Sequence, residues 1–244
     1  MKVTYCSITD KGDRINNEDS IAAVEWKKDY CFVVADGLGG HEKGEVASKL
    51  VTDTAVELFK KEGFSEFFLR EAFEIGQERL IARQIKEKLE GDMKTTLVIL
   101  GINDREVNWG HIGDSRLYHF QNKKIIKHTY DHSVPQMLVN IGEIEEKDIR
   151  SHPDRSIVLK VMGMEWEHPF YEIGEPVAST QGQSFLLCTD GFWENIEDEE
   201  MVMCLKKSKS VYEWISYMEE IVVRTGKNKE KDMDNYSAVG VWIR

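Results

Sequence analysis

The chain has few cysteines, and none of them has a paired spacing. Its 244 residues include only four, Cys6, Cys31, Cys188 and Cys204, with no Cys-x-x-Cys pair. This pattern disfavours both a structural zinc site and a disulfide scaffold. Cys31 and Cys188 stand inside apolar runs typical of strands. We therefore expect buried free thiols in a protein that works in a reducing compartment.

Long apolar runs and an excess of basic residues are also missing. The N-terminal MKVTYCSITDKGDR contains no apolar segment of signal-peptide length, and no segment approaches a membrane span. Lys and Arg total 32 against 44 for Asp and Glu, which gives a net charge of −12. A general nucleic-acid binder would show a clustered basic excess instead. We expect a cytoplasmic protein, or one cut from a longer parent, that binds neither membranes nor nucleic acid.

The sequence has only four prolines and no break in composition, so we expect one domain spanning 1–244. A chain of this length can bury a core without cross-links. Apolar spacing predicts a helix over 44–61, another over 65–90, and two later helices over 197–206 and 211–225. Strand-like runs occupy 20–24, 30–35, 95–102, 107–112, 117–120, 124–127, 184–189 and 237–243. This order predicts an α+β fold with a central antiparallel β core and helical pairs outside it.

Four separated segments each place an acidic residue at the end of an apolar run. An isolated acidic residue there needs no explanation, because Asp favours turns. If the strands pack side by side, however, four carboxylates converge, and such a cluster is not kept without cations. Hard divalent metals prefer oxygen ligands of this kind. The segments are RINNEDS at 14–20, VVADGLGGH at 33–41, LLCTDGFW at 186–193 and DMDNYSAVGV at 232–241.

The glycine-rich turn after Asp36 has two alternative interpretations. A dinucleotide-binding turn needs a third glycine, and Glu42 stands at that position. In the alternative, Asp36 offers its carboxylate while Gly37 lets the backbone bend so that its carbonyl faces a cation. A helix-capping role for Asp36 would suffice for this segment alone. The repeat of the same apolar-run–Asp–Gly design before Asp190 favours the metal interpretation.

Six ordered motifs give the chain a family resemblance that extends from Arg14 to the last strand. It resembles the PPM-type (type 2C) serine/threonine protein phosphatases, the bacterial branch above all. The resemblance implies a four-layer αββα sandwich of two antiparallel sheets flanked by helical pairs, with a two-metal Mn²⁺ or Mg²⁺ site at one end. It also implies a variable flap region within 133–164, where recognition of the target protein varies. The motifs are VVADGLGGHEKGEVAS, HIGDSRLYHF, DHSVPQML, HPDRSIVLKVMG, LLCTDGFWENI and DNYSAVGVWI.

The resemblance assigns roles to the acidic residues. Asp36 corresponds to the carboxylate that bridges the two metals, and the carbonyl of Gly37 to a ligand of the second metal. Asp190 and Asp234 correspond to ligands of the first metal. Glu18 corresponds to the acidic residue that serves the second metal, directly or through water.

Two further aspartates have other implied positions. Asp19 is expected to hold a metal-bound water rather than a metal. Asp114, in the GDSR turn, has two compatible interpretations. It fixes the turn by bonding Arg116 or backbone groups, or it contributes with Asp190 to a weaker third metal site.

The resemblance also implies the reaction, the hydrolysis of phosphoserine and phosphothreonine in proteins. Two cations about 3.5–4 Å apart can lower the pKa of a shared water towards neutrality, which gives a hydroxide for direct attack on phosphorus. No phosphoenzyme is then needed, and no cysteine here has the arginine spacing of a Cys-x₅-Arg phosphatase loop. The planar fork of Arg14 suits two phosphoryl oxygens. His41 is the candidate general acid, or else a cap of the following helix.

The implied partners are phosphoprotein substrates and a cognate kinase, and we expect a monomer.

The chain departs from the family pattern at three places outside the expected ligands. The Gly12–Arg14 spacing is one residue shorter than usual, Lys94 replaces a common glycine, and Ser156 replaces a common asparagine. These changes concern loop shape and substrate preference.

A second hypothesis is a catalytically inactive phosphatase-like module that binds a partner. A calcium-binding domain ranks last, because the sequence has no EF-hand spacing.

Overall fold

The computed structural model describes residues 1–38, 43–89, 91–228 and 232–244, and its core is a pair of antiparallel sheets. A short two-stranded sheet lies beside them. The prediction of an α+β fold with antiparallel sheets is therefore confirmed. Sheet A has the order β1 (Val3–Asp10), β13 (Tyr236–Ile243), β12 (Gln183–Cys188), β8 (Arg116–Gln121) and β9 (Lys124–His128). Sheet B has the order β10 (Glu172–Ile173), β7 (Glu106–Ile112), β6 (Leu97–Ile102), β3 (Asp29–Ala35) and β2 (Ser20–Trp26), with β11 (Val177–Ala178) also paired to β7; the small sheet joins β4 (Gly37–Leu38) to β5 (Lys94–Thr95).

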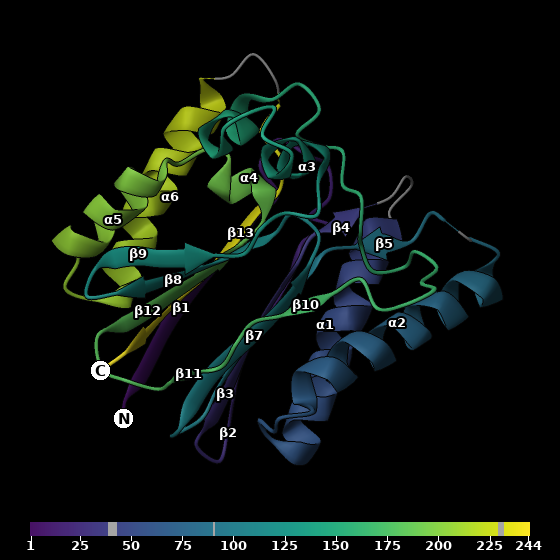
Figure 1. Cartoon of the computed structure of the whole chain (residues 1–244), viewed down its shortest axis with the longest axis horizontal. Coiled ribbons are helices and arrows are strands. Elements are labelled where there is room, and N and C mark those ends of the chain that lie inside the picture. Colours follow the sequence, from purple (N-terminus) through teal and green to yellow (C-terminus); the bar gives the residue numbers. More distant parts are fainter. Residues whose placement is uncertain (39–42, 90, 229–231) are drawn as a thin grey trace.

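Helices cover the outer face of each sheet (Figure 1). One pair packs on sheet B, and a second pair packs on sheet A on the opposite side of the molecule. Shorter helical segments gather at one end of the sheets. The helices are α1 (Lys43–Glu62) and α2 (Phe68–Glu87) on sheet B, α5 (Asp198–Lys207) and α6 (Val211–Lys227) on sheet A, and the shorter α3 (Val134–Asn140), 3₁₀ helix η1 (Glu146–Ser151) and α4 (Asp190–Trp193).

Three hydrophobic clusters fill the spaces between these layers. On β3, Cys31 and Val33 point towards α1 and α2, whereas Phe32 and Val34 point towards the other sheet. This alternation follows from the two-residue period of a strand. Because both faces of β3 are covered, its run from Cys31 to Ala35 is buried without interruption. The order of layers is thus helices, sheet B, sheet A and helices.

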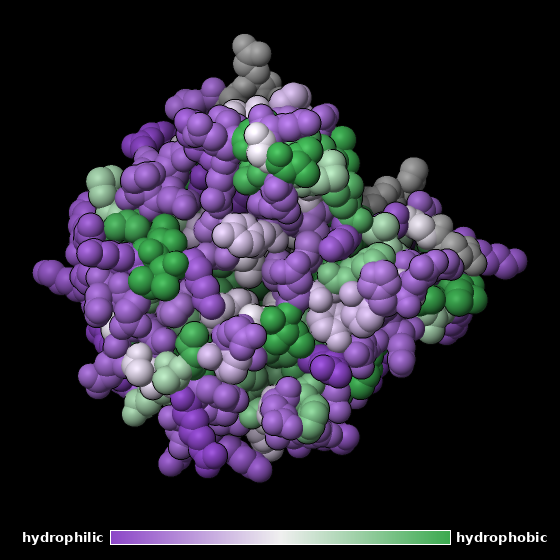
Figure 2. Space-filling view, in the orientation of Figure 1, coloured by the Kyte–Doolittle hydropathy of each residue, from purple (hydrophilic) through white to green (hydrophobic). Residues whose placement is uncertain are grey.

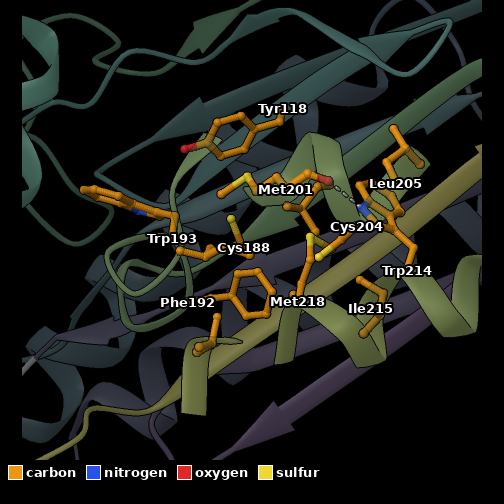
Figure 3. Packing of buried hydrophobic residues seen from close by; sticks show 14 of the residues in the cluster. Tyr118, Cys188, Phe192, Trp193, Met201, Cys204, Leu205, Trp214, Ile215 and Met218 are labelled. Carbon is orange, nitrogen blue, oxygen red and sulfur yellow. Dashed lines mark hydrogen bonds between the residues drawn. The ribbon is translucent and has the colours of Figure 1, made fainter. Parts of the chain in front are cut away.

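The layer between sheet A and its helices is built around Trp214 of α6. The indole packs edge-on against Phe120 with the ring centroids 5.3 Å apart. Its Nε1–H donates to the carbonyl of Met201 over 3.3 Å (Figure 3). Ser210 caps α6 by accepting a hydrogen bond from the backbone N–H of Glu213. Such a cap satisfies a donor that the first helical turn leaves free. Packing and capping together fix α6 against the sheet.

The surface drawn in Figure 2 is mostly hydrophilic, with small separate apolar groups. One group lies over α3, where Met137 and Ile141 are exposed. All four cysteines are free, and Cys31 and Cys188 are buried as expected. In the described parts of the chain, no helix combines the length and the apolar character needed to cross a bilayer.

Strand β1 and the end of helix α2 differ from the sequence prediction. Strand β1 has no counterpart among the predicted strands. None of its residues is fully buried, so the run lacks a clear apolar pattern, and its pairing with β13 comes from tertiary context. Helix α2 ends at Glu87 rather than near position 90, because Lys88 adopts a left-handed conformation with φ +56°.

Replacing Trp214 by alanine tests the importance of the outer core layer. We expect Trp214→Ala to lower the free energy of unfolding by about 3–5 kcal/mol, because it leaves a cavity and removes a buried hydrogen bond. Tyr212→Ala on the same helix is the matched control, since that ring is 68% exposed. Urea unfolding measures both. Equal losses for the two variants would contradict this account of the core.

Candidate functional site

Acidic side chains from separate segments line one cavity at the end of the paired sheets. Its volume is about 570 Å³. Asp36 follows β3, Asp190 follows β12, and Asp234 precedes β13. The structure therefore brings these three predicted carboxylates to one cavity. The lining comprises Asp13, Arg14, Ile15, Asn16, Glu18, Asp36, Gly37, Leu38, Asp114, Ser156, Val158, Asp190, Asp232, Asp234 and Asn235.

The backbone of Asp36 is held on both sides by a pair of threonines. Its N–H donates to Oγ1 of Thr96 over 2.9 Å, and its carbonyl accepts from the N–H of Thr96 and from Oγ1 of Thr95. These bonds satisfy both peptide groups of Asp36, so its carboxylate is free to face the cavity. The two threonines stand directly before the buried strand β6. Asp36 is thus anchored to the rigid part of sheet B.

Two glycines let the start of α1 cross the Asp36–Gly37 turn at very short range. A Cβ on Gly37 would lie 2.3 Å from the backbone of Gly44, and a Cβ on Gly44 would lie 2.6 Å from Oε2 of Glu18. The role predicted for Gly37 rested on backbone bending. Its φ is not in the left-handed region, so the structural need for glycine here is space rather than an unusual dihedral angle. This crossing brings Glu18 next to the turn.

Asn235 fixes the loop that carries Arg14 and Glu18. Its Oδ1 accepts from the N–H of Glu18 over 2.8 Å, while its Nδ2 donates to the carbonyls of Lys11 and Asn16. One side chain therefore ties three backbone groups of the loop to the start of β13. The sequence prediction missed this role, although Asn235 stands in the quoted DNYSAVGVWI segment and its neighbour Asp234 was identified.

The cation of the site pairs with one of its carboxylates. Nη2 of Arg14 lies 2.8 Å from Oδ2 of Asp234, and both side chains are about half exposed, at 55% and 48%. The hydrogen bond and the charge of Asp234 raise the pKa of Arg14 above its ordinary value. An exposed pair of this kind contributes little stability. It can therefore exchange for other partners at small cost.

Neighbouring residues hold the turn that carries Asp114. Nε1 of Trp193 donates to the carbonyl of Asp114 over 2.9 Å. One of the predicted alternatives paired Asp114 with Arg116. That pairing is wrong, because Arg116 makes two 2.8 Å bonds to Asp131 and stacks 3.5 Å from the Trp193 ring. Asp114 itself is 4% exposed and lines the cavity.

Asp19 lies outside the cavity lining, directly behind it. Thr189 Oγ1 donates to its Oδ2 over 3.1 Å, whereas its Oδ1 is buried with no hydrogen-bond partner. Burial raises the pKa of Asp19 to about 7. A buried carboxylate oxygen without a partner is costly unless a donor or a cation reaches it. The expectation that Asp19 holds a metal-bound water stays a prediction.

Burial, reinforced by mutual repulsion, governs the electrostatics of the carboxylates in the cavity. Burial, reinforced by Glu194 and Asp234, raises the pKa of Asp190 to about 7. Burial also raises the pKa of Asp36 well above its ordinary value, with further contributions from Asp19, Asp190 and Asp114. Such shifts arise where carboxylates share a site without positive charge. A set of carboxylate and carbonyl oxygens fits hard divalent cations, which would remove the repulsion.

Sequence reasoning missed several residues of the cavity. Asp13 and Asp232 line it too, and Asp13 Oδ2 accepts from the N–H of Met233 over 2.9 Å. Both stand within two residues of a predicted site residue, which was the available signal. His41, the predicted general acid, lies outside the described residues.

The comparisons with known proteins agree with this geometry. Residues 11–235 match the family model described as protein phosphatase 2C, so the chain belongs to that family. A serine/threonine phosphatase stp of Listeria welshimeri is 32% identical over 214 residues, which is 84% of each chain. The crystal structure of the serine/threonine phosphatase PstP/Ppp of Mycobacterium tuberculosis superposes with a TM-score of 0.86 at 31% identity, over 99% of both chains. A catalytic domain of PstP in complex with two manganese ions gives a TM-score of 0.81 at 29% identity, over 98% of this chain and 97% of that one.

The raised pKa of Asp190 predicts a pH-dependent stability for the metal-free protein. Its folded-state pKa of about 7 lies above the ordinary 3.8. The folded state therefore holds the proton more tightly, and stability falls as pH rises between these two values. From pH 5.5 to 8, wild type should lose about 2 kcal/mol more than Asp190→Asn. Urea unfolding in EDTA measures this difference, and identical pH dependence in both proteins would refute it.

Proposed function

We propose that this chain is a metal-dependent protein serine/threonine phosphatase. The observation that carries the proposal is the convergence of Glu18, Asp36, Asp114, Asp190 and Asp234 beside Arg14 in one cavity. Membership of the protein phosphatase 2C family supports the same activity. The names of the similar proteins point in this direction as well, since they are serine/threonine phosphatases.

Two divalent cations, Mn²⁺ or Mg²⁺, fit the oxygen donors of the cavity. In this proposal Asp36 would serve both cations. Glu18 and the backbone carbonyl of Gly37 would serve one of them, and Asp190 and Asp234 would serve the other. When bound, the cations would supply an activated water and neutralise charge on the phosphoryl oxygens. The manganese-bound PstP domain of similar fold supports a pair of ions.

Two aspartates assist this arrangement. Asp19, behind the cavity, would orient water through its unpartnered Oδ1. Asp114 would contribute, with Asp190, to a third and weaker cation site. The near-complete burial of Asp114 beside the cavity supports that role, because a buried carboxylate of raised pKa gains most from a neighbouring cation.

Arg14 would hold and orient the phosphoryl group. Its guanidinium can present two parallel N–H donors to two phosphoryl oxygens. The exposed pair with Asp234 makes this possible, since Asp234 can turn to a cation when Arg14 turns to the substrate. His41 remains the proposed proton donor to the leaving hydroxyl, with a helix cap as its alternative role.

The proposed substrates are phosphoserine and phosphothreonine residues of proteins, with a serine/threonine kinase as the opposing enzyme. Apolar Ile15, Leu38 and Val158 share the cavity wall and would contact residues that flank the phosphorylated one. Val158 belongs to the flap region 133–164, where we place target recognition. We further propose one catalytic domain over 1–244 that acts as a cytoplasmic monomer. An inactive interaction module has no specific observation in its favour.

Removal of the metals or of their shared ligand should abolish activity. We expect EDTA to reduce hydrolysis of a phosphothreonine peptide to background, and Mn²⁺ to restore it. Asp36→Asn should lower kcat at least about 10³-fold, because electrostatic stabilisation of this kind contributes several kcal/mol. Asp234→Asn should also weaken the response to Mn²⁺. Full activity in the presence of EDTA, or full activity of the Asp36→Asn variant, would contradict the proposed mechanism.

Substitutions of Arg14 distinguish the effect of its positive charge on activity from that of its planar guanidinium. We expect Arg14→Ala to lower kcat/KM for the peptide about 10–100-fold, because charged hydrogen bonds contribute about 1.5–3 kcal/mol. Arg14→Lys should recover part of the loss, since lysine keeps the charge without the fork. Arg105→Ala is the control, because that side chain is 90% exposed and pairs with its neighbour Asp104. A loss no larger than the control's would remove Arg14 from substrate binding.

A further inference from the structure

Two stacked histidines lie behind the turn that carries Asp114. The rings of His111, on β7, and His132 have centroids 4.9 Å apart and planes within 8° of parallel. Both residues are more than nine-tenths buried, at 4% and 7% exposure. Neither histidine lines the cavity, and the proposed reaction uses neither of them.

His132 forms hydrogen bonds with both backbone groups of Gly113, its N–H and its carbonyl. The backbone N–H of Gly113 donates to Nδ1 of His132 over 3.1 Å, and the backbone N–H of His132 donates to the carbonyl of Gly113 over 2.9 Å. The first bond requires a lone pair on Nδ1. The proton of the neutral ring must therefore sit on Nε2, which then donates to Oε1 of Glu172 over 3.2 Å.

The stacked pair with Glu172 also resembles a metal site, but its protonation argues against one. One ligand atom from each of His111, His132 and Glu172 lies within 4.8 Å of the others. Nε2 of His132 carries the proton, so it has no lone pair to give a metal. Nε2 of His111 faces the carbonyl of Tyr130 at 2.8 Å. Nearly parallel rings, moreover, direct their lone pairs side by side rather than towards a common point.

Asp131 and His132 are consecutive, and together they hold both sides of the Asp114 turn. Asp131 binds Arg116, two residues after Asp114, through two bonds of 2.8 Å. His132 binds Gly113, the residue before it. Position 113 requires glycine, because its φ is +101° and a Cβ there would lie 2.6 Å from Thr96.

The same residue connects this turn to the flap region. The backbone carbonyl of His132 accepts from the N–H of Leu159 over 2.7 Å, and Ser133 forms an isolated bridge with Val158. Val158 lines the cavity. His132 therefore contacts the segment before Asp114 with its ring and the segment after Val158 with its backbone.

We propose that His132 is a positioning residue that sets the orientation of Asp114 through the Gly113 peptide. The proposal rests on the function proposed above, in which Asp114 serves as a cation ligand. Burial, with a contribution from His111, lowers the pKa of His132 to about 4. The ring is thus neutral near pH 7 and keeps the acceptor that the Gly113 N–H needs. Without that acceptor, a buried donor would lose its partner and the turn would shift.

Two substitutions, each of which places a polar atom near one ring nitrogen, test which nitrogen of His132 holds the Gly113 peptide. An asparagine at 132 places Oδ1 as many bonds from Cβ as Nδ1, whereas a glutamine reaches the position of Nε2. We expect His132→Asn to retain the Gly113 bond and His132→Gln to lose it. In ¹H–¹⁵N spectra of the metal-free protein, the Gly113 amide proton should stay near its wild-type shift in the first variant. It should move upfield by several tenths of a ppm in the second.

The response to manganese gives the functional readout. The Mn²⁺ concentration for half-maximal activity should rise at least about tenfold in His132→Gln, as in Asp114→Asn, and less than about threefold in His132→Asn. Exposed His168→Gln is the control. Equal spectra and equal Mn²⁺ responses in the two His132 variants would overturn the proposal. If Asp114→Asn responds like wild type, the role of Asp114 fails, whereas activity in Asp36→Asn would refute the proposed function itself.

Discussion

Repulsion among buried carboxylates is the constraint on which the rest of the site depends. Strand ends from both sheets deliver Asp36, Asp190 and Asp114 to one cavity, where Arg14 is the only cationic side chain among the described lining residues. Their raised pKa values record the cost of this arrangement in the metal-free protein. A fold that keeps such a cluster must compensate for it elsewhere, through the packed layers on either side of the sheets and through cations in the cavity.

The neighbourhood of the cluster shows how the chain resists this repulsion. Three of the acidic residues are held through their backbone groups. Thr95 and Thr96 bind the peptide groups of Asp36, Asn235 ties down the loop of Glu18, and Trp193 holds the carbonyl of Asp114. Preorganised ligands of this kind bind a cation without further loss of conformational entropy. The proposed role of His132 extends the same principle one residue further from the cavity.

Much of the fold could be predicted from sequence, because the buried strands and amphipathic helices carry strong patterns. Helix α1 was predicted within one residue of its observed ends. Strand β1 was not, since its half-exposed residues give no clear period and pairing with β13 defines it. Asp36 and Asp190 could be identified by their position after apolar runs, whereas Asp13 and Asp232 were missed. The role of Asn235 and the pairing of Arg116 with Asp131 could not, because both depend on contacts between distant segments.

The central claim is that the carboxylate cluster holds a pair of divalent cations. Anomalous diffraction from crystals grown with Mn²⁺ tests it most directly. The account predicts two strong anomalous peaks about 3.5–4 Å apart in the cavity, both within bonding distance of Asp36, one also near Asp190 and Asp234 and the other near Glu18. No anomalous peak between these residues at saturating Mn²⁺, or a single peak away from Asp36, would contradict it.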